Sequence, residues 1–163
     1  MYDAVFRGEW DSKEGGYDAW DAGVREKAVM DLYGGLGACG VMRGFQGWLG
    51  MSHVGVGEGT LRVVPLVREA GVYLLLRPFF KARKAEKEVG REGYLDRGNW
   101  VFTGGREMGS ELQGAVMGCA QEISEEWHPH LELEKALVSI PEVRPGDYVV
   151  WHCDSEFSWR SWV

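Results

Sequence analysis

Short apolar runs separated by glycine and proline characterise the C-terminal third of the chain. Residues 136–140 and 148–153 are rich in β-branched and aromatic side chains, which predicts two strands. Between them, Pro145, Gly146 and Asp147 predict a tight turn, because proline presets its φ angle and glycine accepts a positive one. This part of the chain therefore predicts two β-strands with a sharp turn before the second.

Two further β-type segments lie in the middle of the chain. Residues 41–52 are aromatic and interrupted by glycine, which favours one strand or a bent pair of strands. The glycine-rich residues 54–59 predict a tight turn, and residues 60–64 predict a short strand that ends at Pro65. Short strands joined by glycine turns are typical of an antiparallel sandwich or jelly roll.

Helical spacing occurs in two places. Asp21 is a suitable N-cap for a helix over 22–33, where apolar side chains recur every four residues. Residues 66–80 also carry apolar side chains at helical spacing, and we expect Pro78 to end that helix. Residues 81–97 mix charges of both signs without an apolar face, which indicates a solvated surface insertion.

The composition is ordinary except for its glycine and tryptophan content. The chain has 163 residues, with 24 glycines, 8 tryptophans and a charged fraction of 26%. A length near ~150 residues is typical of one domain, and a charged fraction of roughly 25% is usual for globular proteins. Many glycine turns and few helical segments predict a mainly β fold with some helix.

Charge, hydropathy and cysteine content exclude several classes of protein. A net charge of −7 disfavours binding to phosphate backbones, so no nucleic-acid partner is expected. The longest apolar run, residues 70–76, is far shorter than the ~20 residues that span a bilayer, so no membrane partner is expected. Cys39, Cys119 and Cys153 form no CxxC pair, which argues against a disulfide framework or zinc ribbon and predicts a reducing, cytoplasmic location.

Two motif matches fail because of their context. Residues 35–40 spell GxGxxG, but a predicted helix precedes them and a strand-like segment follows, which reverses the order that a dinucleotide site needs. Residues 50–53 begin like the nucleophile elbow of serine hydrolases, but Val54 replaces the final glycine. The sequence therefore predicts neither a dinucleotide-binding protein nor a serine hydrolase.

His128, His130 and Glu134 form a candidate metal-binding group. Residues i and i+2 of a strand share a face, so an HxH pair followed by a glutamate could chelate a metal ion, an arrangement that resembles cupins. Pro129 is poorly suited to a central strand. The alternative is a turn-associated pair of histidines packed near a helix end.

His152 and Asp154 spell an HxD pattern. A histidine and an aspartate two residues apart on a strand, with a distant second histidine, form the facial triad of non-haem Fe(II) oxygenases. No histidine follows Asp154 in this sequence. We therefore do not expect this HxD to be the first half of such a triad.

Five segments, in order along the chain, resemble one known family. They are FQGWLGMSHVGVGEGTLRVVPLV, YLLLRPFF, ELQGAVMG, WHPHLEL and IPEVRPGDYVVWHCD. The family is known as domain of unknown function 1479, and it is similar to the phytanoyl-CoA dioxygenase branch of Fe(II)/2-oxoglutarate oxygenases. The resemblance implies an incomplete double-stranded β-helix (jelly roll) over residues 1–154, followed by a divergent tail over 155–163.

The resemblance also implies roles for particular residues. Trp48 and Ser52 are expected on a strand that lines the cofactor pocket, with Thr60 and Arg62 on the next strand. Arg62 is suited to hold a carboxylate through a bidentate contact, and an outward salt bridge is the alternative. His152 is the candidate metal ligand on the strand that carries the distal histidine, and a packed core histidine is the alternative.

Iron and 2-oxoglutarate are the cofactors that the resemblance implies for the intact family, with a small molecule as substrate. The family's usual form has a further histidine three residues beyond the WHCD aspartate, where this chain has Phe157, and its proximal HxD would precede Met1. We therefore expect a truncated dioxygenase-like protein that is inactive as this chain, holds no cofactor, and self-associates through open sheet edges. A cupin-type metal protein and a non-catalytic interaction module are the alternatives.

Overall fold

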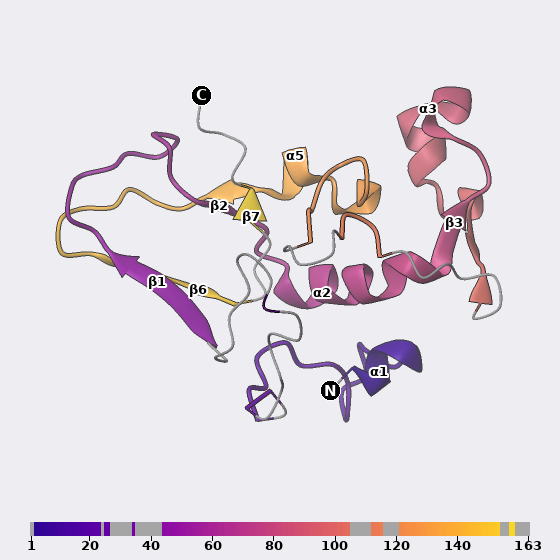
Figure 1. Ribbon diagram of the computed structural model, residues 1–163, viewed down its shortest axis with the longest axis horizontal. Coiled ribbons are helices and arrows are strands. Elements are labelled where there is room, and N and C mark those ends of the chain that lie inside the picture. Colours follow the sequence, from indigo (N-terminus) through magenta and orange to yellow (C-terminus); the bar gives the residue numbers. More distant parts are fainter. Residues whose placement is uncertain are drawn as a thin grey trace.

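The fold consists of short strands and helices connected by long loops (Figure 1). In the computed structural model, the described residues are 2–23, 25–26, 34, 44–104, 112–115, 121–153 and 157–158. Their strands form three separate antiparallel sheets, with β1 next to β6, β2 between β5 and β7, and β3 next to β4.

The β1–β6 sheet joins two segments far apart in the sequence. Strand β1 (Phe45–Leu49) pairs with β6 (Tyr148–His152), and the two lie side by side in Figure 1. Where the pair ends, Gly50 N donates to Asp147 O and Gly146 N donates to Gly50 O, both at 2.8 Å. Gly146 has φ +95°, as the predicted turn requires. The predicted strands within 41–52 and 148–153 are confirmed, with shorter bounds.

The three-stranded sheet contains only two-residue strands. Strand β2 (Arg62–Val63) pairs with both β5 (Val138–Ser139) and β7 (Phe157–Ser158). Before β2, Gly57 and Gly59 both have positive φ, which is how the chain makes the predicted turn over 54–59. The strands predicted within 60–64 and 136–140 are therefore confirmed in shorter form.

Helix α2 (Val67–Leu76) confirms the helix predicted within 66–80. Pro78 does not simply end it. The chain continues into a 3₁₀ turn, η1 (Arg77–Phe79), which contains that proline near its start. A proline at this position costs no hydrogen bond, because the first N–H groups of a helical turn have no partner within it.

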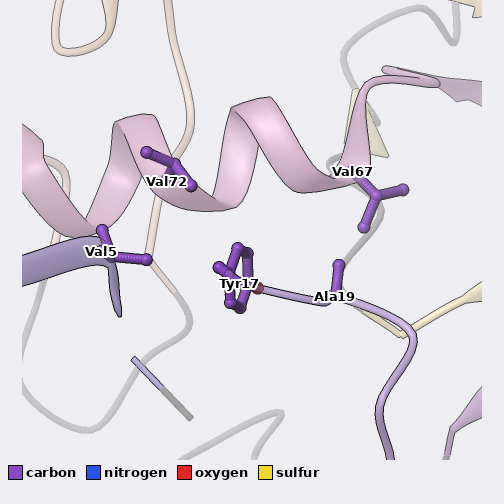
Figure 2. Close-up of a cluster of buried hydrophobic side chains, with 5 residues drawn as sticks. All are labelled: Val5, Tyr17, Ala19, Val67 and Val72. Carbon is purple, nitrogen blue, oxygen red and sulfur yellow. The ribbon is translucent and has the colours of Figure 1, made fainter. Parts of the chain in front are cut away.

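A small hydrophobic core packs α2 against the N-terminal segment. Its members are buried and come from α1 (Asp3–Phe6), the loop after it and α2: Val5, Tyr17, Ala19, Val67 and Val72. Figure 2 shows the Tyr17 ring lying beneath α2, between Val5 and Ala19. The opening stretch, irregular in sequence, is thus held in place by burial of its apolar side chains.

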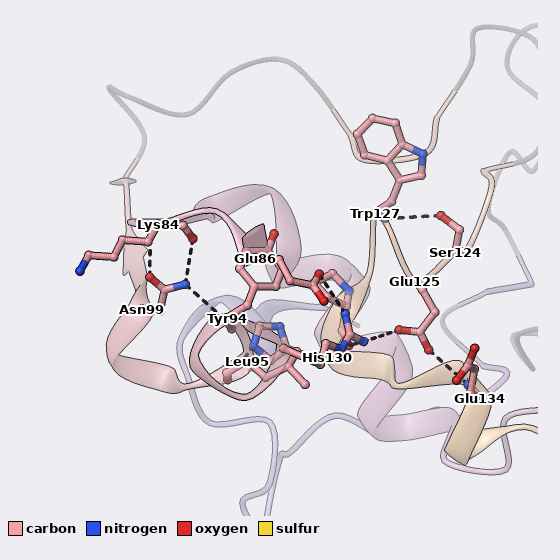
Figure 3. Close-up of polar contacts among 12 residues, drawn as sticks. Lys84, Glu86, Tyr94, Leu95, Asn99, Ser124, Glu125, Trp127, His130 and Glu134 are labelled. Carbon is pink, nitrogen blue, oxygen red and sulfur yellow. Dashed lines mark hydrogen bonds and ion pairs between the residues drawn. The ribbon is translucent and has the colours of Figure 1, made fainter. Parts of the chain in front are cut away.

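The predicted surface insertion over 81–97 is largely exposed, but it has regular structure. It runs from β3 (Phe80–Ala82) through α3 (Glu86–Leu95) and the 3₁₀ turn η2 (Arg97–Asn99) to β4 (Trp100–Phe102). The Asn99 side chain connects the two ends, accepting from Lys84 N at 3.0 Å and donating to Lys84 O at 3.1 Å (Figure 3).

The helix predicted over 22–33 is wrong where the structure describes it. Ala22, Gly23, Arg25 and Glu26 lie in loops and turns, and the other residues of that range are outside the described part. Asp21 Oδ1 accepts from Gly23 N at 2.9 Å, so it caps a local turn. The polar side chain predicted to start a helix therefore stabilises a loop conformation instead.

The remaining described elements are the 3₁₀ turn η3 (Pro129–Leu131) and the short helix α5 (Leu133–Ala136). In the described part of the chain, the small sheets do not close into a barrel. The incomplete double-stranded β-helix over 1–154 and the divergent tail over 155–163 stay predictions. No helix within the described residues is both long and apolar enough to cross a membrane.

Candidate functional site

His152, the candidate metal ligand, is the last residue of β6 and is buried. Its ring lies edge-on to the indole of Trp20, with 4.5 Å between ring centroids and an interplanar angle of 66°. Phe45, its partner in the β1–β6 register, contributes a second ring at 6.2 Å. His152 is therefore enclosed by aromatic side chains, an arrangement favourable for packing.

A small cavity of about 40 Å³ adjoins the His152 ring. Arg25 and Cys153 line it, and Arg25 Nη1 donates to the Sγ of Cys153 at 3.5 Å. Arg25 is buried, and Cys153 is half-buried. Such a volume holds a few water molecules and is well below the roughly 300–1,000 Å³ of small-molecule sites.

Trp48 and His152 lie on opposite faces of the β1–β6 sheet. Paired residues of an antiparallel sheet share a face, and successive residues alternate. Phe45 is paired with His152, whereas Trp48 is paired with Val149, three positions further along each strand. The Trp48 ring packs against Trp151 instead, at a centroid distance of 5.1 Å. The predicted pocket wall and the predicted metal ligand are thus not brought together.

Ser52, Thr60 and Arg62 lie outside strands β1 and β6, the pair of strands that positions His152. Ser52 is exposed beyond the end of β1, and Thr60 precedes β2 rather than lying on it. Arg62 Nη2 donates to Leu137 O at 3.5 Å. With the residues that the structure describes, Arg62 makes no ion pair, so the alternative of an outward salt bridge is not seen among them. The cofactor roles of these residues stay predictions.

The candidate group at 128–134 is not a metal site. His128 immediately precedes η3 and His130 lies within it, so the strand geometry assumed for the HxH pair is wrong. Among the described residues, no three or more His, Cys, Asp or Glu side chains are grouped so that they could hold a metal ion. Glu134 instead lies in the first turn of α5, where its backbone N–H donates to Glu125 Oε1 at 3.2 Å (Figure 3). The alternative, a turn-associated pair of histidines near a helix end, describes the structure.

His128 is fully buried, and its ring is held by the preceding turn. Its Nδ1 accepts from Ser124 N at 3.4 Å, and its own backbone N–H donates to Ser124 O at 2.8 Å. Burial lowers the pKa of His128 to about 4, and the positive charge of Arg77 acts in the same direction. His128 is therefore a neutral core histidine near pH 7.

His130 occupies a different environment on the exposed side of η3. Its Nε2 lies 3.1 Å from Leu95 O (Figure 3), and because a carbonyl only accepts, Nε2 carries the proton. The ring lies edge-on to Trp100, with 4.8 Å between centroids. Partial burial lowers the pKa of His130, although the Leu95 carbonyl opposes the shift.

Sequence patterns missed the residues that surround His152 and those that surround His130. Trp20 and Arg25 are separated from His152 by almost the whole chain, and no spacing rule links them. Arg77 lies at the end of a predicted helix, and Trp100 follows the predicted surface insertion over 81–97 without a predicted role of its own. The available signal was composition, since tryptophan and arginine are enriched where proteins bind other molecules.

Comparisons with known proteins identify relatives along nearly the whole chain. A model of the Gig2-like family matches residues 1–161. The "Uncharacterized protein YbiU" of Escherichia coli (strain K12) is 34% identical over 153 residues, which cover 94% of this chain and 30% of that protein. The chain thus spans about a third of the length of this relative.

Solved structures agree with that relationship. GlcNAc Inducible Gene 2, GIG2 (DUF1479), from Candida albicans matches with a TM-score of 0.73 and 31% identity, over 96% of this chain and 31% of that one. The "Putative Oxidoreductase from Salmonella typhimurium LT2" matches with a TM-score of 0.65 and 35% identity, over 94% of this chain and 30% of that one. The predicted resemblance to domain of unknown function 1479 is confirmed.

Proposed function

The chain belongs to the Gig2-like family, and on that basis we propose that it is a Fe(II)/2-oxoglutarate dioxygenase-like protein of unknown substrate without oxygenase activity as this chain. The name "Putative Oxidoreductase" of a similar Salmonella structure supports a scaffold of the oxidoreductase type. The similarity to phytanoyl-CoA dioxygenases in the sequence segments supports the finer assignment.

The observation that carries the proposal is the position of His152. It ends the β6 strand that follows the turn at Gly146, in the segment that resembles the distal-ligand strand of the oxygenases. Burial and a register fixed by pairing with β1 hold its ring in one place. A fixed histidine at a strand end is what a metal site of this class requires of one ligand.

The described surroundings of His152 do not fit an iron ion on their own. The side chains next to it include the rings of Trp20 and Phe45, the Arg25 guanidinium and the Cys153 thiol. The Asp21 carboxylate also lines the cavity, but its Oδ1 already accepts from Gly23 N at 2.9 Å. Rings without lone pairs and a cationic guanidinium are not metal ligands, and the thiol accepts from Arg25. A non-haem Fe(II) oxygenase site instead needs two histidines and a carboxylate. We therefore derive no oxidation step from these residues.

The experiment measures succinate released from labelled 2-oxoglutarate in the presence of Fe(II), ascorbate and oxygen. Wild type, His152→Ala and His53→Ala should all release no more succinate than the reaction mixture does with iron and without protein. His53 is a matched control because it is exposed and contacts Glu142 at 3.4 Å, away from the His152 cavity. Succinate release by wild type and His53→Ala that is lost in His152→Ala would show that the chain is an active oxygenase.

A second candidate function is a non-catalytic interaction module, and one face of the β1–β6 sheet favours it. Four apolar side chains on that face are each more than half exposed: Phe45, Leu49, Tyr148 and Val150. Apolar surface of this kind favours association with another chain when it lies next to strand edges that have no neighbouring strand among the described residues. The partner that we propose is a second copy of this chain.

Sedimentation velocity over a range of protein concentrations tests self-association. The wild type should form a larger species as concentration rises, and Leu49→Lys should shift that transition to higher concentration. Val56→Lys is the matched control, because Val56 is exposed in the turn before β2. A wild type that stays monomeric at every concentration contradicts the proposed module.

A further inference from the structure

A cavity of about 580 Å³ lies beside His130, on a different set of elements from His152. Residues from α2, η1, β3, α3, η2, β4 and η3 line it. Its apolar walls come from Leu76, Phe80, Leu95 and Trp100. The volume is within the roughly 300–1,000 Å³ of sites that bind small molecules, and mostly apolar walls are usual for such sites.

The side chains around this cavity are held in fixed positions. Arg77 donates Nε to Trp127 O at 3.0 Å and Nη1 to Phe80 O at 3.1 Å, and its guanidinium carbon lies 4.9 Å from the Trp100 ring centroid. The Trp100 indole donates Nε1 to Tyr94 O at 2.6 Å. Because these groups already have partners, a ligand would meet a preformed aromatic surface with little ordering cost.

Arg97 differs from Arg77 because it is available to a ligand. Its side chain is exposed at the cavity and makes no hydrogen bond or ion pair with any part of the chain that the structure describes. The carboxylate of the neighbouring Asp96 is used locally, since its Oδ1 accepts from Gly98 N at 2.8 Å. Arg97 therefore offers an open guanidinium fork at the edge of an apolar cavity.

The charge of the cavity is opposite to that of the whole chain. Among the residues that the structure describes, its lining contains Arg77 and Arg97 and neither Asp nor Glu, although the chain has a net charge of −7. Two cations without a lining carboxylate favour an anionic ligand. Apolar and aromatic walls favour a flat, apolar body attached to that anion.

We infer that this cavity binds a small aromatic carboxylate, with its ring against Trp100 and Phe80 and its carboxylate on Arg97. The inference is independent of the proposed oxygenase-like function, because the two cavities share no lining residue among those that the structure describes. Edge-to-face or stacked rings and one charge-assisted bidentate contact supply the binding energy.

Isothermal titration calorimetry of the whole chain with 2-naphthoate tests this inference, and 2-naphthalenemethanol is the neutral probe of the same shape. The carboxylate should bind at least about tenfold more tightly than the alcohol, because only the carboxylate forms a charge-assisted contact with the guanidinium. Arg97→Met should remove most of that preference and leave the binding of the alcohol unchanged.

Arg83→Met is the matched control, because Arg83 is an exposed arginine that does not line the cavity. It should keep the preference for the carboxylate. Trp100→Leu should weaken both probes, since it removes the ring against which they pack. The inference is wrong if both probes bind equally to wild type, if neither binds, or if Arg97→Met and Arg83→Met have the same effect.

Discussion

The guanidinium of Arg77 lies over the indole of Trp100, 4.9 Å from the ring centroid, and two main-chain carbonyls hold it there. One of those carbonyls belongs to Trp127, 50 residues along the chain, and the other to Phe80. A single side chain thus connects the end of α2 to β3, β4 and the segment before η3. Its charge also lowers the pKa of the nearby histidines, His128 and His130.

We predict that Arg77→Met destabilises the fold and raises the pKa of His130. Losing two hydrogen bonds and a cation–π contact should lower the free energy of unfolding by about 1–3 kcal/mol. Removing a positive charge makes protonation of a neighbouring imidazole easier, so the pKa rises. Urea unfolding and an NMR titration of the His130 Cε1 proton measure the two effects. Arg83→Met should change neither, and an unaltered His130 titration in Arg77→Met contradicts the prediction.

Local patterns predicted the strands β1, β2, β5 and β6, missed β3, β4 and β7, and specified no strand pairing. The turn before β6 could be predicted because Pro145 and Gly146 set their own backbone angles, as the φ of +95° at Gly146 confirms. The pairing of Phe45 with His152 depends on contacts across most of the chain, which no local rule specifies. A shift of one residue would have placed His152 on the other face.

The candidate site was harder to predict for the same reason. Trp20 covers His152, yet the two residues come from opposite ends of the chain. For the histidine pair, the assumed strand was wrong because Pro129 starts a 3₁₀ turn, where residues two apart do not share a face. Motif spacing implies a shared face only when the secondary structure is known, so His128 and His130 have different environments.

Two valines, Val5 and Val56, allow a matched mutational test of the core beneath α2. Val5 is 1% exposed and belongs to the cluster with Tyr17 and Val72, whereas Val56 is 64% exposed in a turn. Val5→Ala should lower the free energy of unfolding by about 1.5–3 kcal/mol, from lost burial and an unfilled cavity. Val56→Ala should cost less than about 0.5 kcal/mol. Urea unfolding that gave equal values would show that the N-terminal segment does not pack on α2.

Gly114 is predicted to be intolerant of any side chain. Its φ is +75°, and an added Cβ would lie 2.0 Å from Glu122 O, next to the His128 ring at 3.4 Å. Gly57 has a similar φ of +82°, but an added Cβ there meets nothing within 4 Å. Gly57→Ala should cost about 1–2 kcal/mol for backbone strain alone, and Gly114→Ala about 1–3 kcal/mol more for the steric conflict. Thermal unfolding compares the two, and equal losses contradict the predicted conflict.

His128 should make the protein less stable in mild acid. Its pKa is about 4 in the folded protein, because burial disfavours the charged ring, and about 6.5 in the unfolded chain. As pH falls below about 6.5, the unfolded state binds a proton that the folded state does not, so stability falls until pH approaches 4. At neutral pH both states are largely unprotonated, and the histidine has little effect on pH dependence.

The measurement is the free energy of unfolding in urea near pH 7.5 and near pH 5, for wild type, His128→Gln and His53→Gln. Wild type should lose about 2 kcal/mol more than His128→Gln over this interval, because each pKa unit corresponds to about 1.4 kcal/mol. Other titrating groups are shared by both proteins and cancel in the comparison. His53→Gln is the control for the exchange of a histidine for a glutamine at an exposed position. Equal losses in wild type and His128→Gln would mean that the His128 ring gains its proton as easily in the folded protein as in the unfolded chain.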